Sequence, residues 1–321
     1  MLEKDSKWRT NYILYDIVFV PIIAKGYKES ELRQKLVDIL QDSKTGLSGV
    51  EISEKLGINR MTITKYLNVF AAEGLVQQKN IGNVNLWFVE EGTEQFSFPQ
   101  DYFRVKTKYL EALMGASSHQ VVNLIRNCIH SGAATPKIMT EIIAPAIDSI
   151  EDLYQQGKIG KSEQKFLNWL ISQSIQITNV IRAEENQQKN VILISADTKN
   201  ILYSEAAAVS FRFNEWKVFN LGDMSDAIDV LLDLDLQKLL GKVWKQKNSI
   251  MIIVVFSSSE DGFKFFSEAI NVIKEKSGKR LHLVLCSKLK KKTTAKADLV
   301  AENLEDVLQW SQTTYESFAK L

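Results

Sequence analysis

The segment from Leu47 to Val89 constrains the fold more than any other part of the chain, because two short amphipathic patterns meet there at a single glycine. In the second pattern, Ile63, Leu67 and Phe70 are spaced at i, i+4 and i+7, so they share one face of a helix. This helix is predicted to run from about Arg60 to Glu73. The segment therefore predicts two short helices, joined by a tight turn, that pack on one core.

The turn and the end of the segment carry their own signals. Gly57 suits the left-handed conformation that ends a helix, where a side chain would clash. Asn59 has a side-chain oxygen that can cap the second helix. Beyond that helix, two short apolar runs flank Gly82-Asn83, which is a tight-turn signal. We expect a β-hairpin after the two helices.

The outer face of the second helix carries side chains that can donate hydrogen bonds to phosphates or base edges. They are Arg60, Thr62, Thr64, Lys65 and Asn68. The run EISEKLGINRMTITKYLNVFAAEGLV resembles the winged helix-turn-helix of bacterial and archaeal transcription regulators. The resemblance implies that the start of this helix enters the major groove of double-stranded DNA, with Lys79 and Asn83 on or near the wing. Winged helices also bind proteins, so a scaffold that holds a protein partner is an alternative.

The charge distribution sets the strength expected of DNA binding. The whole chain has a net charge of +1, which gives no overall basic field. Residues 44–79 hold five basic side chains against three acidic ones, a surplus of two. Because so small a surplus steers DNA only modestly, we expect a homodimer or higher homo-oligomer to supply enough phosphate contacts. An apolar helix within residues 1–28 is predicted to pack on this domain or on a second copy of it.

Several classes of protein are excluded by what the chain lacks. Cys128 and Cys286 are the only cysteines, and the three histidines are widely spaced, so neither a disulfide framework nor a structural zinc site is expected. No signal peptide or membrane span is evident, so we expect a cytoplasmic protein without a membrane partner. No nucleophile elbow, phosphate loop or Gly-x-Gly-x-x-Gly is present, so we expect no enzyme.

The rest of the chain predicts two further domains. Four helical segments, at about 101–114, 118–131, 136–157 and 161–187, have short connections, as in an antiparallel four-helix bundle. Apolar strands then alternate with helices, which is typical of a doubly wound, Rossmann-like parallel sheet. The expected fold is multidomain α and α/β. Its parts are a winged helix-turn-helix at 1–92, a linker at 93–100, a bundle at 101–188 and a Rossmann-like domain at 189–321.

A bundle followed by such a sheet resembles the cobalamin-binding module of methionine synthase and of light-responsive cobalamin regulators. The resemblance covers about Tyr102 to Trp310 and includes two motifs. In the bundle, Gly132-Ala-Ala-Thr leads to Tyr154-Gln-Gln-Gly157, and in the sheet domain the motif is Glu215-Trp216-Lys217-Val218-Phe219-Asn220-Leu221-Gly222. With a winged helix in front, the order is similar to a photoreceptor repressor in which ligand state controls oligomerisation and release of DNA.

The ligand-binding motif departs from the family pattern. The family's Asp-x-His-x-x-Gly is represented by Asp197, Lys199 and Leu202, so the cobalt-binding His and the Gly that admits the nucleotide tail are both replaced. A lysine ammonium has no lone pair with which to bind cobalt. The family's Gly-Gly is Cys286-Ser287 here, although its Ser is kept as Ser257.

Positions in the bundle also differ. Where the photoreceptor branch has Trp and Glu-His, this chain has Tyr154, Gln164 and Lys165. Cobalamin is therefore suggested by the fold, but His-ligated binding is not expected. Base-on binding, or ligation by His130, is an alternative to a simple packed role for that histidine.

Another ligand at the same edge is the remaining expectation. Lys199, Ser257, Ser259 and the lysine run Lys288–Lys296 suit an anionic small-molecule effector, unless that run is only a solvated loop. The predicted function is a one-component DNA-binding transcription regulator whose sensor responds to another ligand or to a partner. The alternatives are a true cobalamin sensor, a corrinoid carrier and an interaction scaffold. The predicted degenerate ligand site consists of Tyr154, Asp197, Lys199, Leu202, Ser257, Ser259 and Cys286.

Overall fold

The computed structural model describes most of the chain, namely residues 29–43, 45–72, 74–89, 96–179, 183–227, 232–244, 248–277, 280–286 and 293–320. The helix predicted within residues 1–28, Ser287 and the first part of the lysine run lie outside these ranges. No helix among the described residues is long and apolar enough to cross a membrane.

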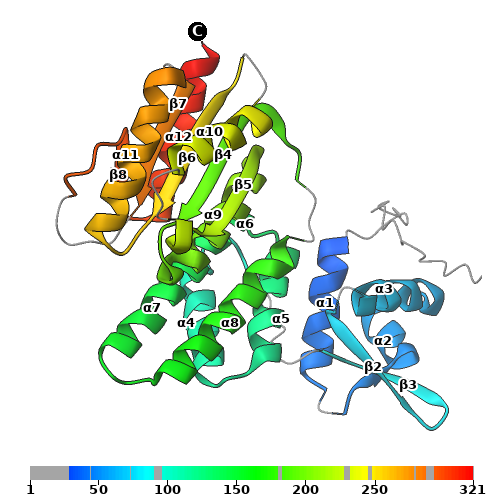
Figure 1. Cartoon of the computed structure of the whole chain (residues 1–321). Coiled ribbons are helices and arrows are strands. Elements are labelled where there is room, and N and C mark those ends of the chain that lie inside the picture. The colour runs from blue at the N-terminus through cyan, green and yellow to red at the C-terminus, as the bar shows by residue number, and fades with distance from the viewer. Residues whose placement is uncertain are drawn as a thin grey trace, which may run out of the picture.

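The first part of the structure, residues 29–89, is called the N-terminal unit here. Three helices and a small antiparallel sheet form it, with strands in the order β1-β3-β2 (Figure 1). The bounds are α1 Glu29–Gln41, β1 Leu47–Ser48, α2 Gly49–Leu56, α3 Arg60–Ala72, β2 Val76–Ile81 and β3 Val84–Val89. The two-residue strand β1 was not predicted, since it exists only through its pairing with Leu86 and Trp87 of β3.

Local chemistry fixes both ends of the turn between α2 and α3. Gly57 has φ of 66°, the left-handed conformation that the sequence predicted. The Asn59 side chain accepts a hydrogen bond from the Met61 backbone N–H at 2.9 Å, so its predicted capping role is also confirmed. Ile63, Leu67 and Phe70 are at most 1% exposed, which confirms the predicted apolar stripe.

The second part, residues 102–178, is a helical bundle. Its elements are α4 Tyr102–Met114, α5 Ser118–His130, α6 Thr135–Ile138, the π-helical turn η1 Met139–Ile143, α7 Ala144–Gln155 and α8 Lys161–Thr178. The single helix predicted at 136–157 is thus interrupted. In a regular helix the ring of Pro145 would clash with the carbonyl four residues earlier. The π turn directly before it closes instead through the Ala144 N–H and the Met139 carbonyl, five residues back.

The prediction that the last bundle helix extends to residue 187 is wrong, because α8 ends at Thr178. The buried Thr178 hydroxyl donates to the Ile175 carbonyl at 2.6 Å, a bond that competes with the helical ladder. Asn186 already belongs to β4, where it pairs with Trp216 of β5. The polar run before Val191 is therefore the start of a strand, exposed at Gln187 and Gln188 and buried at Lys189 and Asn190, which its composition does not indicate.

The third part, residues 186–319, is called the sheet domain. Five parallel strands lie in the order β5-β4-β6-β7-β8. They are β4 Asn186–Ser195, β5 Trp216–Asp223, β6 Ile250–Phe256, β7 Leu281–Cys286 and β8 Leu299–Ala301. The longer helices are α9 Ile201–Phe213, α10 Leu232–Val243, α11 Glu260–Ser277 and α12 Leu304–Ala319. The predicted mixed α and parallel-sheet fold is confirmed, although β8 was not foreseen.

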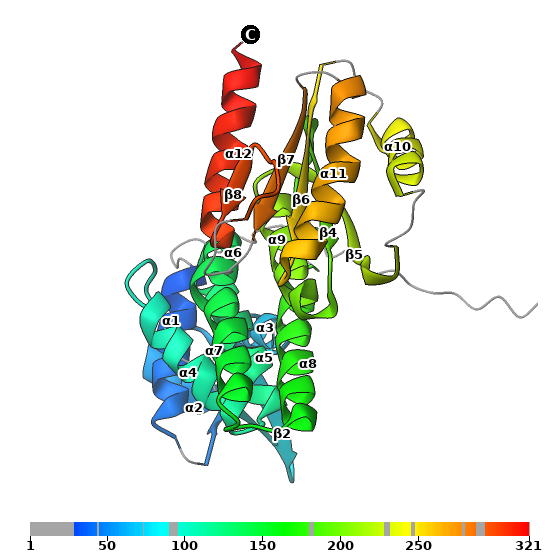
Figure 2. The same cartoon turned by 60° about the vertical axis from the view of Figure 1, so that its left-hand side comes forward.

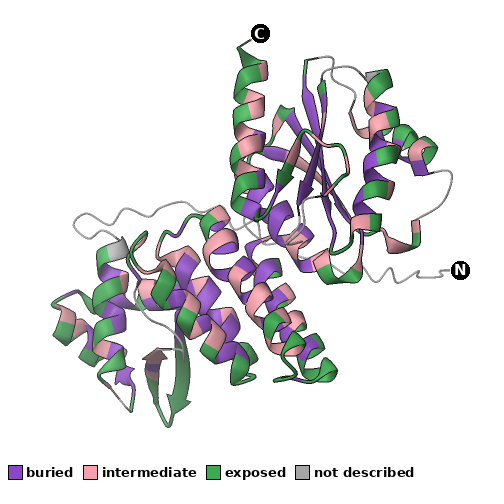
Figure 3. Cartoon of the chain, turned by 90° about the vertical axis from the view of Figure 1, so that its left-hand side faces the viewer, coloured by how far each residue is buried: buried purple, intermediate pink, exposed green. Residues whose placement is uncertain are grey.

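The sheet is covered on both faces. Helices α9 and α12 lie on one side, and α10 and α11 lie on the other (Figure 2). Along β6, Ile252 and Val254 join the core under α9, whereas Ile253 and Val255 join the core under α11. The strands β4, β6 and β7 are mainly buried along the middle of the domain, while the β2–β3 hairpin is largely exposed (Figure 3).

The order of the strands and helices places a crevice at the carboxyl ends of β4 and β6. The connection from β4 leads to α9 on one face, and the connection from β6 leads to α11 on the other. Where neighbouring strands diverge in this way, a crevice opens beyond their carboxyl ends. The bundle shares its core with the α9 side of the sheet, so α7 and α8 are held against this crevice.

Candidate functional site

A cavity of about 620 Å³ lies where α7 and α8 meet the carboxyl edge of the sheet. The first loop after β4 contributes Thr198, Lys199 and Asn200, and the loop after β6 contributes Ser257 and Ser258. Of the predicted ligand-site residues, the structure brings Tyr154, Lys199 and Ser257 to this cavity. The other four lie beside it or beneath it.

Asp197 ties the two loops together instead of facing the cavity. One carboxylate oxygen accepts hydrogen bonds from the N–H and the hydroxyl of Ser258, at 2.7 and 2.9 Å. The other accepts from the Lys199 N–H at 3.1 Å and from the Asn200 amide at 2.7 Å. Since both oxygens are used in this way, the carboxylate that orients a histidine in the family pattern serves here as a structural clamp.

The serines after β6 are also engaged within their own loop. The Ser257 hydroxyl donates to the Ser259 carbonyl at 3.0 Å and accepts from the Ser259 N–H at 3.1 Å. The Ser259 hydroxyl accepts from the Gly262 N–H at 3.1 Å. A Cβ on Gly262 would stand only 2.6 Å from the Ser257 oxygen, so the start of α11 requires glycine there. These hydroxyls therefore shape the cavity wall more than they offer free donors.

Leu202 and Cys286 close the region below the cavity. Both belong to the apolar core shared by the bundle and the sheet, at 9% and 6% exposure. Burial raises the pKa of the Cys286 thiol to about 12, so it is a neutral thiol at physiological pH. Nearby, the Tyr203 hydroxyl is hydrogen-bonded to the Asp148 carboxylate of α7, and burial raises its pKa.

Three ammonium groups face the cavity, from Lys161, Lys165 and Lys199. Lys161 donates to Gln164 at 2.8 Å and lies over the Tyr154 ring, 4.7 Å from its centroid. The ammonium groups of Lys165 and Lys199 have no hydrogen-bond or ion-pair partner among the residues that the structure describes.

The acidic side chains of the cavity wall are already bonded. Glu151 accepts from the Gln155 and Gln164 amides, both at 2.6 Å, and Asp148 accepts from Tyr203. The sequence prediction missed Lys161, Asn168 and Thr198. The sequence does contain part of the pattern that could have identified them, since Lys161, Lys165 and Asn168 are spaced at i, i+4 and i+7 and share one face of α8.

These residues do not fit a His-ligated corrinoid. Lys199 occupies the ligand position, and no histidine is among the described residues that line the cavity. The predicted alternative, ligation by His130, does not fit either, because His130 is at the end of α5 beside Arg33 and Arg126. Leu202 fills the core where the family pattern leaves space for the nucleotide tail.

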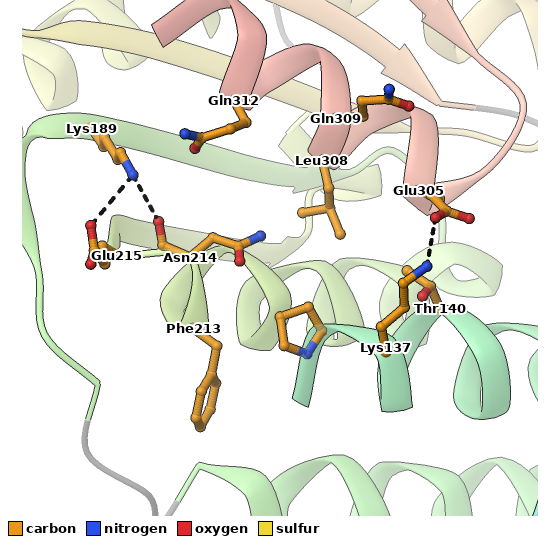
Figure 4. A pocket seen from close by; sticks show the side chains of 11 residues that line it. Lys137, Thr140, Lys189, Phe213, Asn214, Glu215, Glu305, Leu308, Gln309 and Gln312 are labelled. Atoms are coloured by element: carbon orange, nitrogen blue, oxygen red, sulfur yellow. Dashed lines mark hydrogen bonds and ion pairs between the residues drawn. The ribbon is translucent and has the colours of Figure 1, made fainter. Parts of the chain in front are cut away.

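A second pocket, also of about 620 Å³, lies between α6, α12 and the end of α9 (Figure 4). Its charges are paired across the opening. Lys137 donates to Glu305 at 2.7 Å, and Lys189 donates to the Asn214 carbonyl at 3.2 Å. Because its lysines already have partners, this pocket is a weaker candidate for a charged ligand than the cavity under α7 and α8.

The predicted DNA-contacting residues lie in the N-terminal unit. Arg60, Thr64, Lys65 and Asn68 are exposed on α3, and Thr62 is partly exposed. Lys79 is exposed on β2 with its ammonium 5.3 Å from the Phe88 ring centroid, and Asn83 is exposed in the hairpin turn. The prediction passed over Met61, which is 74% exposed in the first turn of α3, two residues after the capping Asn59.

Comparisons with known proteins support the fold of the larger part of the chain. No family model and no curated protein matches the sequence. The solved monomethylamine corrinoid protein of Methanosarcina barkeri is similar over 66% of this chain and 99% of its own, with 13% identity and a TM-score of 0.52. A cobalamin-binding protein from Desulfitobacterium hafniense shares 11% identity over 64% of this chain and 97% of its own, with a TM-score of 0.37, too low to define a fold. The chain thus contains a module with a cobalamin-binding-like fold.

Proposed function

We propose that this protein is a one-component transcription regulator that binds double-stranded DNA through α3 and the β2–β3 hairpin. The observation that carries the proposal is the exposed polar face at the start of α3, on a unit in which two short helices are followed by a β-hairpin, the order that we expect of a winged helix-turn-helix. Arg60 and Lys65 supply charge there, and Thr62, Thr64 and Asn68 supply neutral donors. The protein binds as a homodimer or higher homo-oligomer.

The corrinoid-protein-like part serves as the sensor and not as a catalyst. Its cavity keeps the position of a ligand site but has lost the metal ligand, so it responds to a different molecule or partner. Binding there changes how two chains associate, and hence the spacing of their two α3 helices. A corrinoid carrier is the main alternative, and it requires a cobalt ligand that the cavity wall does not supply.

Salt-dependent binding to duplex DNA tests the regulator proposal. The full-length protein is titrated into a labelled pool of random-sequence duplexes at several salt concentrations. Replacing Arg60 and Lys65 by Ala should reduce the slope of log affinity against log salt by about 2, because two phosphate contacts are lost. The matched control replaces the exposed Lys238 and Lys276, which lie on α10 and α11, by Ala. Equal effects of both pairs, or no duplex binding at low salt, would favour the protein scaffold.

The absorption spectrum tests the sensor assignment separately. The protein is incubated with adenosylcobalamin and with methylcobalamin in the dark and is then freed of unbound cobalamin. We expect a colourless protein, because Lys199 and Leu202 replace the residues that hold the cobalt and the tail. A retained corrinoid spectrum would instead support a true cobalamin sensor or carrier.

A further inference from the structure

We infer that the cavity between α7, α8 and the sheet edge binds an organic phosphate with a planar ring, of nucleotide size. This inference rests on the proposed sensor role, and it assigns a ligand class to that site. The volume of about 620 Å³ lies within the range of small-molecule pockets, roughly 300–1,000 Å³.

The anion is recognised by lysines from both walls. Lys165 comes from α8 of the bundle, and Lys199 comes from the loop before α9. Neither ammonium group has a counter-ion among the described residues, whereas the carboxylates of the wall are already bonded to Tyr203, Gln155 and Gln164. A phosphate between the two exposed ammonium groups would be held through strong, charge-assisted hydrogen bonds.

Two backbone donors of the same loops are not available to the anion. The N–H groups of Lys199 and Ser258 already bond the Asp197 carboxylate, at 3.1 and 2.7 Å. The site therefore differs from a glycine-rich phosphate loop, in which backbone N–H groups hold the phosphate. Because side chains must do this work here, replacing the two lysines should remove most of the binding.

The remainder of the wall suits a planar ring with polar edges. Tyr154 and Tyr203 present partly buried aromatic rings, and Ile147 adds apolar surface. The half-buried Asn168 amide, one turn after Lys165 on the same helix face, has no hydrogen-bond partner among the described residues. An amide can both donate and accept at the edge of a base. A bare phosphate would leave this part of the cavity unused.

Isothermal titration calorimetry on the full-length protein tests the inference with three probes: adenosine 5′-diphosphate, adenosine and inorganic phosphate. We expect the diphosphate to bind more tightly than either fragment. Replacing Lys165 and Lys199 by Met should weaken it at least about tenfold, since two charge-assisted contacts are lost. The control replaces Lys238 and Lys276 by Met and should bind as the unchanged protein does. Thermal melting checks that both variants are folded.

Three results would overturn the inference. They are no binding of the diphosphate, equal weakening by both lysine pairs, and binding of inorganic phosphate as tight as that of the diphosphate. The last would mean a simple anion site without ring recognition. Salt-dependent DNA binding of the same preparation separates the two proposals. If DNA binds and the diphosphate does not, the ligand class is wrong and the regulator proposal stands.

Discussion

Gly57 shows how one residue fixes the angle between α2 and α3. Its φ is 66°, and nothing lies within 4 Å of where a Cβ would be. Gly57→Ala should therefore lower the free energy of unfolding by about 1 kcal/mol through backbone conformation alone. Urea unfolding measures this. Gly49→Ala is the matched control, because Gly49 lies in α2 without a positive φ and also has open space around it, and it should not destabilise.

His130 makes stability depend on pH. Burial, reinforced by Arg33 and Arg126, lowers its pKa to about 4 from an ordinary value of 6.5, and its Nδ1 is buried without a hydrogen bond to any residue that the structure describes. As pH falls below 6.5, His130 becomes protonated in the unfolded chain, whereas in the folded chain it stays neutral until about pH 4. The stability that this difference in pKa contributes is fully present above pH 6.5, and it is lost as pH falls from 6.5 to about 4.

The measurement is the free energy of unfolding at several pH values between 7 and 4. In the variant His130→Gln, the free energy of unfolding should fall less steeply as the pH is lowered. If the variant keeps the slope of the original protein, His130 is not the source of the pH dependence.

Some features of individual residues could be predicted from the sequence, and others could not. The left-handed Gly57, the Asn59 cap and the loss of the histidine at Lys199 follow from local rules. The positions of Asn168 and Thr198 in the cavity wall do not follow from local rules, because the cavity forms only where the bundle packs against the sheet. Asp197 was placed in the ligand site by family resemblance, and its clamp on Ser258 depends on a loop that lies 61 residues further along the chain.

At the scale of elements, long apolar or periodic segments were predicted well and short ones were missed. The strand β7 is six residues long and is one of the predicted apolar strands, whereas β1 and β8 have two and three residues and depend on a neighbouring strand for their existence. The π turn before Pro145 was also missed, because a hydrophobic period alone does not reveal how a proline is accommodated.

The strand β6 allows a test of the two-sided sheet. Ile252 and Ile253 are both fully buried but face opposite cores. Replacing either by Ala should lower the free energy of unfolding by about 2–5 kcal/mol, since each deletion leaves a cavity. Val300→Ala on β8, at a residue that is 47% exposed, is the control and should have little effect. A large loss at only one of the two isoleucines would mean that one face is open to solvent.

At the scale of the whole molecule, the proposed ligand site and the proposed DNA site are joined by packed elements. The cavity lysine Lys165 is on α8, α8 packs on α5, and the Arg126 guanidinium of α5 lies against Gly74 of the N-terminal unit. Adjacent elements alone do not establish coupling, which requires that a ligand change an equilibrium. The sequence could not predict this arrangement, because the approach of α5 to the N-terminal unit depends on tertiary packing.

Reciprocal binding measurements test this coupling. If the cavity is the sensor, saturating adenosine 5′-diphosphate should change the dissociation constant for DNA by a factor of about 5–150, in either direction. Saturating DNA must then change the affinity for the diphosphate by the same factor. Replacing Lys165 and Lys199 by Met should abolish the effect while leaving DNA affinity without ligand unchanged, because neither lysine lies in the N-terminal unit. Replacing Arg60 and Lys65 by Ala should have the opposite effect: the affinity for DNA should fall, and the affinity for the diphosphate in the absence of DNA should stay unchanged. A DNA affinity that is identical with and without bound diphosphate would separate the two sites and contradict the sensor role.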